Sequence, residues 1–347
     1  MEAILCDQTA LNFWRSRSEP IGSVPSDRAC LPERRGVVDH DVPSAAIVSE
    51  LRTWGLVGED EVHLLVTSAD KRRRLKGVNF TVVSNPVPQG SFERAMGQVY
   101  VVSPEMLFVQ LAGELPLVEL LEIGYELCGT YRMIDGQPSY SLAPLTSTSK
   151  LRSYAQHVKG LRGRSAALQA VGWIIDGSAS PAETALAIAF KLPLRLGGCA
   201  LGDFVLNQEL ELNEGAARIL GRSSMHPDFY WSRGKHPVEY DSSLYHASRE
   251  QAEYDERRRN AYGAMGMNVT IFTPRHLVDL ELFDQMVTSI RRFAGIRLQA
   301  VPQGYDALHS ERLHQTFRYW FDLKDNFGLG DDFVERASAW DAPSTDW

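Results

Sequence analysis

Hydrophobic and polar positions alternate along the N-terminal half in a way typical of short strands between amphipathic helices. Apolar side chains recur every second residue in the strand-like segments and every three or four residues in the helical ones. The expected strands are residues 61–67, 78–84 and 98–103, and the expected helices are residues 44–54, a segment starting at Ser103-Pro104, and residues 116–130. The order predicts a small α/β domain.

The C-terminal half carries a second series of such segments. Ser180, Pro181 and Glu183 have the spacing of an N-cap, a first-turn proline and a capping-box glutamate. The expected helices are residues 164–175, 181–192, 248–264, 276–293 and 311–323, and the expected strands are residues 203–212, 229–231, 237–241 and 267–273. A turn at residues 232–235 joins two of these strands. We therefore expect a mixed sheet flanked by helices.

Acidic residues gather where this second sheet is expected. Glu239 and Asp241 are two positions apart, so on a strand they point to the same face. Asp228 lies at the start of the neighbouring strand and is expected beside them. Three carboxylates on one face repel each other unless a cation or protons neutralise them. Oxygen-rich sites of this kind suit Mg²⁺ or Mn²⁺, and Asp228 and Glu239 are the predicted ligands.

This stretch resembles the PD-(D/E)XK nuclease superfamily, in particular its very-short-patch-repair-like endonucleases. The matching parts are Pro227-Asp228, Glu239-Tyr240-Asp241, His246, Asp255 with Arg257-Arg258-Arg259, and the strand Val269-Thr270-Ile271-Phe272. The resemblance implies a restriction-endonuclease-like fold and a metal-dependent DNA endonuclease that hydrolyses phosphodiesters, in a defence or mobile-element context. The chain departs from the superfamily pattern at two positions, since Asp241 replaces the Lys and Ser242 replaces a Gly.

The resemblance also implies roles for two further side chains. Glu183 matches the first-helix acid that flanks the metal site in many of these nucleases, while its spacing alone indicates a helix cap. His246 is an acid–base candidate or a structural hydrogen-bond donor. The predicted catalytic set is Glu183, Asp228, Glu239, Asp241 and His246. At least one of the three consecutive arginines is expected in solvent, and another near the acids or a phosphate.

The N-terminal series of elements resembles the core of abortive-infection (AbiEi-like) antitoxin proteins. The resemblance covers about residues 42–135 and depends on the order of the elements, with Ser103-Pro104-Glu105 and Leu111-Ala112 as its motifs. A small scaffold without a site of its own is the alternative interpretation of this domain.

The net charge of −8 argues against a nucleic-acid protein as a whole, but one window is basic. No acidic residue lies between Asp135 and Asp176. The basic residues predicted to contact DNA phosphates there are Lys150, Arg152, Lys159, Arg162 and Arg164. The alternative function is a DNA-binding regulator or antitoxin-like protein whose nuclease-like domain is an inactive scaffold, which the missing Lys and the acidic balance favour.

The predicted organisation is an arm (1–41), an AbiEi-like domain (42–135), a basic linker (136–164), a nuclease-like domain (165–300) and a tail (301–347). No apolar run reaches membrane-spanning length, so no membrane association is expected. The first residues do not have the pattern of a signal peptide. Cys6, Cys30, Cys128 and Cys199 form no CxxC pair, which indicates free thiols and a cytoplasmic protein. A homo-oligomer remains compatible with this sequence.

Overall fold

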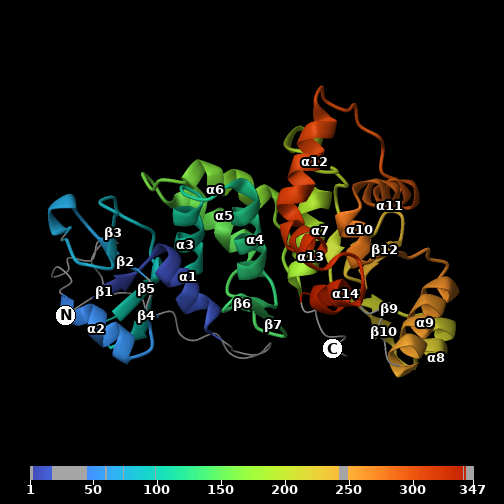
Figure 1. Ribbon diagram of the computed structural model, residues 1–347, viewed down its shortest axis with the longest axis horizontal. Helices are drawn as coiled ribbons and strands as arrows, with labels where there is room; N and C mark the ends of the chain where they lie inside the picture. The colour runs from blue at the N-terminus through green and yellow to red at the C-terminus, as the bar shows by residue number, and fades with distance from the viewer. Residues whose placement is uncertain are drawn as a thin grey trace. The chain divides into compact units, whose positions relative to one another are not determined.

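The computed structural model describes residues 3–17, 45–58, 61–72, 74–97, 99–241, 249–338 and 340. The chain forms two compact units, of which the first comprises Met1–Cys128 and Arg132–Ile174 and the second Gly129–Tyr131 and Ile175–Trp347. Both units combine helices with strands (Figure 1), which confirms the predicted α/β class.

The first unit is built on a five-stranded sheet with the order β3-β2-β1-β5-β4. Its strands are β1 (Ala3–Leu5), β2 (Val62–Val66), β3 (Val78–Val82), β4 (Phe92–Met96) and β5 (Val99–Val102). The central strand β1 is fully buried and pairs with β2 on one side and β5 on the other. The structure therefore corrects the predicted arm, because residues 3–17 belong to this unit. A strand of three residues is too short to show a period in the sequence.

Helices complete the first unit. They are α1 (Asp7–Arg15), α2 (Ala45–Thr53), α3 (Pro104–Leu111), α4 (Leu117–Cys128), α5 (Thr148–His157) and α6 (Arg164–Ala170), with the short 3-10 turns η1 (Ala69–Lys71) and η2 (Val171–Trp173) and the hairpin β6 (Arg132–Ile134) and β7 (Gln137–Ser139). The predicted helix start at Ser103-Pro104 is confirmed, and Ser103 caps α3 by accepting a hydrogen bond from the Met106 N–H at 3.3 Å. The predicted linker 136–164 is also corrected, because α5 packs against α3 and α6.

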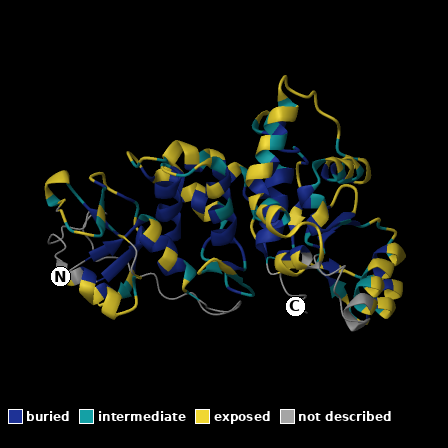
Figure 2. Cartoon of the chain, in the orientation of Figure 1, coloured by how far each residue is buried: buried dark blue, intermediate teal, exposed yellow. Residues whose placement is uncertain are grey.

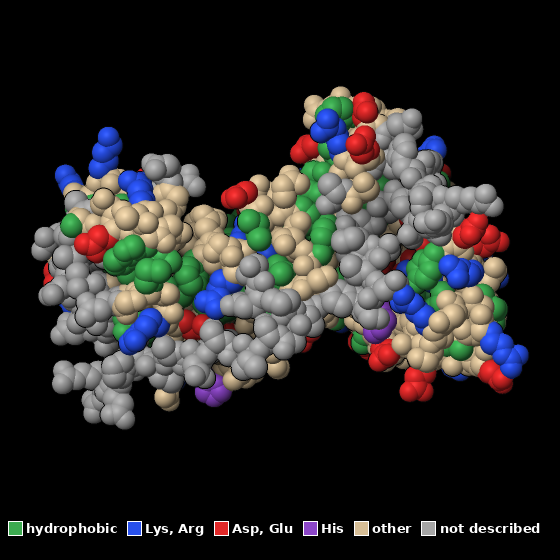
Figure 3. Space-filling model, turned by 90° about the horizontal axis from the view of Figure 1, so that it is seen from below, with side chains coloured by type: hydrophobic (Ala, Val, Ile, Leu, Met, Phe, Trp, Pro, Cys, Tyr) green, Lys and Arg blue, Asp and Glu red, His purple; other side chains and the backbone are tan. Residues whose placement is uncertain are grey.

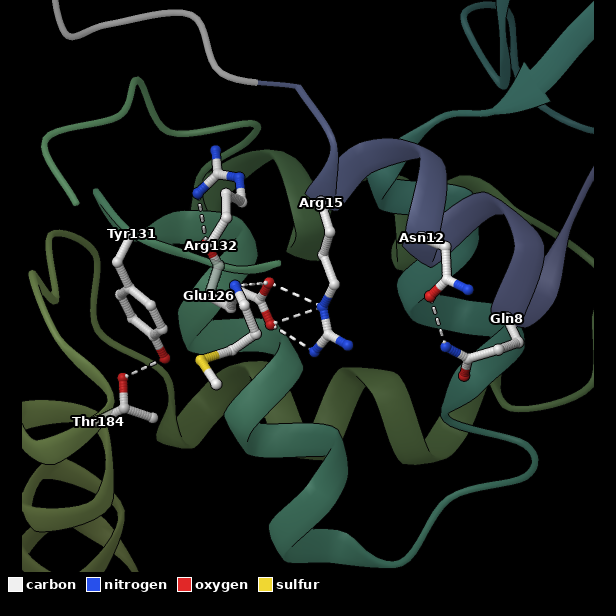
Figure 4. Close-up of polar contacts among 8 residues, drawn as sticks. Gln8, Asn12, Arg15, Glu126, Tyr131, Arg132 and Thr184 are labelled. Carbon is white, nitrogen blue, oxygen red and sulfur yellow. Dashed lines mark hydrogen bonds and ion pairs between the residues drawn. The ribbon is translucent and has the colours of Figure 1, made fainter. Parts of the chain in front are cut away.

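A buried carboxylate connects three elements of this unit (Figure 4). Glu126 on α4 accepts hydrogen bonds from the Arg15 side chain on α1 at 2.7 Å and from the Met133 N–H on β6 at 2.9 Å. The Arg132 side chain donates to the Glu126 carbonyl at 3.0 Å. Each charge in this network has a partner, as a buried charge requires.

The second unit contains a four-stranded mixed sheet with the order β13-β12-β11-β8. Its strands are β8 (Val205–Leu206), β11 (Phe229–Trp231), β12 (His236–Tyr240) and β13 (Thr270–Phe272). The β11–β12 hairpin is antiparallel, and β12 runs parallel to β13. The predicted mixed sheet is therefore present, with the strand order now defined.

Helices cover both faces of this sheet, whose residues are largely buried (Figure 2). On one face, Phe190 of α7 (Pro181–Lys191) contacts the rings of Phe229 at 5.3 Å and Phe272 at 5.5 Å. On the other face, Tyr230 joins a hydrophobic cluster with α8 (Glu214–Leu220) and α9 (Arg249–Ala264). Glu239 points toward this second face, because it contacts α9.

Two predicted elements of the second unit, a strand and a helix, are each divided into two in the structure. Strand 203–212 is split into β8 and β9 (Leu210–Glu211), because Asn207 between them adopts a φ of 50°; β9 pairs with β10 (Ser224–Met225). The predicted helix 276–293 is split at Asp279, whose side chain caps the second part. The two parts are α10 (Pro274–Val278) and α11 (Leu280–Phe293).

The predicted tail is an integral part of the second unit. It forms α12 (Tyr305–Thr316), α13 (Arg318–Phe327) and α14 (Asp331–Ser338). Helix α12 packs on α7 and on the 3-10 turn η3 (Leu194–Leu196), and α13 packs on α10. Among the helices of the described ranges, none is long and apolar enough to cross a membrane.

Candidate active site

Three of the predicted acids come from three different segments of the second unit. Glu183 lies in the first turn of α7, Asp228 directly precedes β11, and Glu239 is on β12. Partial burial, together with the negative charges of Glu239 and Glu183, raises the pKa of Asp228 well above its usual value. The charges of Glu239 and Glu183 therefore both act on Asp228.

The hairpin register explains why Asp228 and Glu239 meet. Phe229 pairs with Val238 across the antiparallel hairpin, so the same register places Asp228 opposite Glu239. Residues directly opposite each other in an antiparallel pair share one face of the sheet. The Asp228 Oδ2 atom accepts a hydrogen bond of 2.6 Å from the Tyr240 N–H, next to Glu239. This bond fixes the Asp228 carboxylate against the end of β12.

Glu183 is positioned by the cap of α7 and by Asn207. The Ser180 hydroxyl accepts from the Glu183 N–H at 3.1 Å, as the sequence spacing predicts. The Glu183 carboxylate accepts from the Ala179 N–H at 3.0 Å, one residue earlier than a standard capping box requires. The Asn207 amide donates to the same oxygen at 2.6 Å, and the Asn207 N–H donates to the Asp228 carbonyl at 3.2 Å. Asn207 thus connects the helix cap to the Asp228 segment.

Two donors from α9 hold Glu239. The Arg258 Nη2 atom lies 2.7 Å from Glu239 Oε1, and the Tyr262 hydroxyl donates a short hydrogen bond to the same oxygen. Arg258 also donates to the His226 carbonyl at 2.9 Å. Burial lowers the pKa of Arg258, but Glu239, Tyr262 and Asp228 together raise it above its usual value, so the guanidinium stays charged. Burial and the Glu239 charge raise the pKa of Tyr262, which keeps its hydroxyl a donor.

Two other predicted residues lie at the end of β12. Asp241 follows the strand directly, and its N–H donates to the Phe272 carbonyl on β13 at 2.8 Å. His246 lies within residues 242–248, outside the described residues. The site as described therefore contains Glu183, Asp228 and Glu239, with Asp241 adjacent in the chain.

Carboxylate oxygens are suitable ligands for a divalent cation, but the described carboxylates are not arranged as a complete metal site. Across the described ranges, no group of three or more His, Cys, Asp and Glu side chains is arranged to hold a metal ion. Asp228 Oδ1 and Glu239 Oε2 accept no hydrogen bond from any described residue. These two oxygens are the hard ligands that Mg²⁺ and Mn²⁺ prefer. One oxygen of Glu239, in contrast, is already neutralised by Arg258.

The predicted phosphate-contacting residues lie in the first unit, and the structure divides them by what they contact. Lys150 and Lys159 are exposed. Arg152, Arg162 and Arg164 are exposed as well, but each has a partner within the unit. Charged side chains of both signs are scattered over the face shown in Figure 3.

Arg162 and Arg164 make contacts within the first unit. Arg162 forms an ion pair of 2.7 Å with Glu114, and Arg164 donates to the Ala155 carbonyl at 2.9 Å and to the Gln156 carbonyl at 3.2 Å. The last carbonyls of a helix lack partners within it, and Arg164 satisfies two of them near the end of α5. Lys150 and Lys159 are therefore the better candidates for phosphate contact.

Sequence reasoning missed Tyr262 and gave Asn207 no specific role. Tyr262 follows Arg258 by four positions on α9, and residues at this spacing lie on the same helix face. The spacing would have indicated Tyr262 if Arg258 had been singled out, but the sequence does not show which of the three consecutive arginines faces the acids. Asn207 had no comparable signal, because its contact to Glu183 depends on a break in the strand.

Comparisons of the chain with models of known protein families, with curated proteins and with solved structures found no match.

Proposed function

We propose that the second unit is a metal-dependent endonuclease domain that hydrolyses phosphodiesters in DNA, with a restriction-endonuclease-like fold. The observation that supports this function is the placement of three acids at one end of a mixed sheet: the hairpin register sets Asp228 opposite Glu239, and Asn207 hydrogen-bonds both the Glu183 carboxylate and the Asp228 carbonyl. Isolated structural carboxylates have no need of such proximity, which costs free energy through repulsion and burial.

In this proposal, Asp228 and Glu239 hold Mg²⁺ or Mn²⁺ through their remaining oxygens, and Glu183 adds negative charge beside them. A bound divalent cation would supply charge stabilisation to the transferring phosphoryl group and make water a better nucleophile. Asp241 assists or orients the attacking water. His246 accepts the proton of that water or donates one to the leaving oxygen as the P–O bond breaks.

The proposed DNA contacts of the first unit come from Lys150 and Lys159. Both are exposed lysines on or just after α5, and DNA binding by such residues depends on phosphate neutralisation and counterion release. On the basis of its order of elements, we propose that this unit is related to AbiEi-like antitoxin modules and that the protein acts in a defence or mobile-element context.

A second candidate function is a DNA-binding regulator or antitoxin-like protein that uses the second unit as an inactive scaffold. The specific observation in its favour is the Arg258–Glu239 ion pair, which neutralises one predicted ligand without any metal. Asp241 at the position of the superfamily Lys supports the same interpretation.

Nicking of supercoiled plasmid separates the two candidates. The nuclease proposal predicts relaxed and linear products with Mg²⁺ or Mn²⁺, and none with EDTA. Asp228→Asn should remove this activity, whereas Asp325→Asn, a change of the same kind at an exposed site, should retain it. DNA binding without metal-dependent nicking would favour the regulator.

A further inference from the structure

The partner of Glu239 in the structure is a positive charge supplied by the chain itself. The Arg258 guanidinium and the Glu239 carboxylate are both largely removed from solvent, with 26% and 11% of their side-chain surfaces exposed. Arg258 acts on Asp228 as well, since it opposes the rise in the pKa of that acid. One guanidinium thus compensates the two proposed metal ligands.

The position of Arg258 is fixed from two sides. Its Nη2 atom donates to the His226 carbonyl as well as to Glu239, and its helix places Tyr262 on the same carboxylate oxygen. The side chain therefore occupies one defined place beside the acids. A divalent cation approaching Glu239 from the same region meets this positive charge, and two like charges near one carboxylate repel.

We propose that Arg258 is an internal counter-ion that competes with the divalent cation, so that metal binding requires Glu239 to exchange the Arg258 ion pair for the metal. This inference rests on the proposed metal-dependent function. It assigns Arg258 a positioning role, in which the arginine keeps the acids together without metal and sets the cation concentration at which the site fills.

Removal of the Arg258 charge should therefore strengthen cation binding while weakening the cation-free fold. Mn²⁺ dissociation constants of the full-length protein, measured by titration calorimetry and by the electron paramagnetic resonance signal of free Mn²⁺, provide a readout that does not depend on cleavage. We expect Arg258→Gln to bind Mn²⁺ about tenfold more tightly than the parent, a change within the usual range of coupling between two binding events. Arg258→Lys keeps the charge and should remain near the parent.

Arg259→Gln is the matched control. Arg259 is the neighbouring residue on α9, is exposed, and makes none of the contacts to the acids. The substitution changes the net charge by the same amount as Arg258→Gln. Its Mn²⁺ affinity should stay within about twofold of the parent, because charges in solvent are screened.

A measurement on the native protein covers the case in which Arg258→Gln does not fold. Mg²⁺ titration of the parent, followed through the side-chain ¹⁵N resonances of its arginines, should shift the Arg258 signal, identified by its loss in Arg258→Lys. If the Arg258 resonance did not change at saturating Mg²⁺, the proposed replacement of the Arg258–Glu239 ion pair by the metal would be overturned.

The outcomes separate this inference from the proposed function. Tighter Mn²⁺ binding by Arg258→Gln, with or without measurable binding by the parent, supports the competition. Equal binding by parent and Arg258→Gln overturns the competition and leaves a metal site in place. Absence of binding in the parent and in every folded variant, including Arg258→Gln, overturns the competition and the metal-dependent function together.

Discussion

At the scale of single residues, the Glu239 carboxylate is the charged partner of Arg258. Glu239→Gln should lower the free energy of unfolding by about 3 kcal/mol or more, because Arg258 would lose its charged partner in a poorly solvated place. The change is measured by chemical denaturation. Glu256→Gln on the exposed side of α9 should stay within about 0.5 kcal/mol of the parent. A Glu239→Gln protein as stable as this control would mean that the ion pair contributes no net stability.

The sequence alone leads to the opposite expectation for this substitution. Clustered carboxylates repel, so deleting one is predicted to leave the stability near its original value or to raise it. The sequence showed that Asp228 and Glu239 would be neighbours, since both flank a hairpin-length turn. It did not show which of three consecutive arginines would reach them, because that choice depends on how α9 is rotated against the sheet.

At the scale of elements, Phe190 joins α7 to the sheet. Besides Phe229 and Phe272, its ring contacts Trp231 at 6.0 Å and Phe283 of α11 at 6.2 Å. Phe190→Ala should therefore cost about 3–5 kcal/mol of unfolding free energy, through lost contacts and the cavity left behind. Leu298→Ala, at a side chain that is 80% exposed, should leave the denaturation midpoint almost unchanged. Equal midpoints for the two variants would contradict the packing described for α7.

His309 fixes α12 to two other elements and should make the stability depend on pH. Its Nδ1 faces the Gly197 carbonyl at 2.6 Å and its Nε2 faces Asp284 at 3.0 Å, and an imidazole can donate to both only when protonated. Burial lowers the pKa of His309, but the hydrogen bonds to Asp284 and Gly197, with the charges of Asp284 and Asp306, raise it overall.

A raised histidine pKa means that this contribution to stability is fully present below the unfolded value of about 6.5 and is lost as pH rises through the folded value. The melting temperature of the parent should therefore fall as the pH increases from about 6 to 8.5, and it should fall less in His309→Gln. Parallel melting curves for the two proteins over this interval would exclude His309 as the source.

Long elements with a clear period were predicted well, and short or interrupted ones were not. Helices α4 and α7 lie where the apolar spacing and the Ser180 cap place them. The central strand β1 has only three residues, and the break at Asn207 needs a backbone conformation that the alternating pattern does not indicate. Tertiary packing determines both features, and a single sequence carries little information on it.

At the scale of the whole molecule, DNA binding tests whether Lys150 and Lys159 contact phosphates. Replacing Lys150 and Lys159 together by Ala should lower the slope of log affinity against log salt by about 0.9 for each phosphate contact removed. The measurement is fluorescence anisotropy with labelled duplex over a series of salt concentrations. Lys76→Ala, an exposed lysine elsewhere in the first unit, is the control. An unchanged slope in the double variant would mean that neither lysine contacts a DNA phosphate.

The division of the chain was predicted less well than its elements. Polar and basic composition suggested a linker at residues 136–164, yet α5 in this range packs against α3. Arg164 illustrates the reason, because its charge satisfies helix carbonyls within the unit. Composition shows which side chains are polar, but it does not show which of them also cover a hydrophobic core.

The central claim is that Asp228 and Glu239 form a divalent cation site, and Mn²⁺-dependent stabilisation of parent and Asp228→Asn tests it most directly. Asn keeps an oxygen to accept the Tyr240 N–H but loses the charge. At a Mn²⁺ concentration 100 times the dissociation constant, the parent should gain about 2.7 kcal/mol, seen as a higher melting temperature. Asp228→Asn should lose most of this gain, and Asp325→Asn should keep it. Equal stabilisation of the parent and Asp228→Asn by Mn²⁺ would contradict the site.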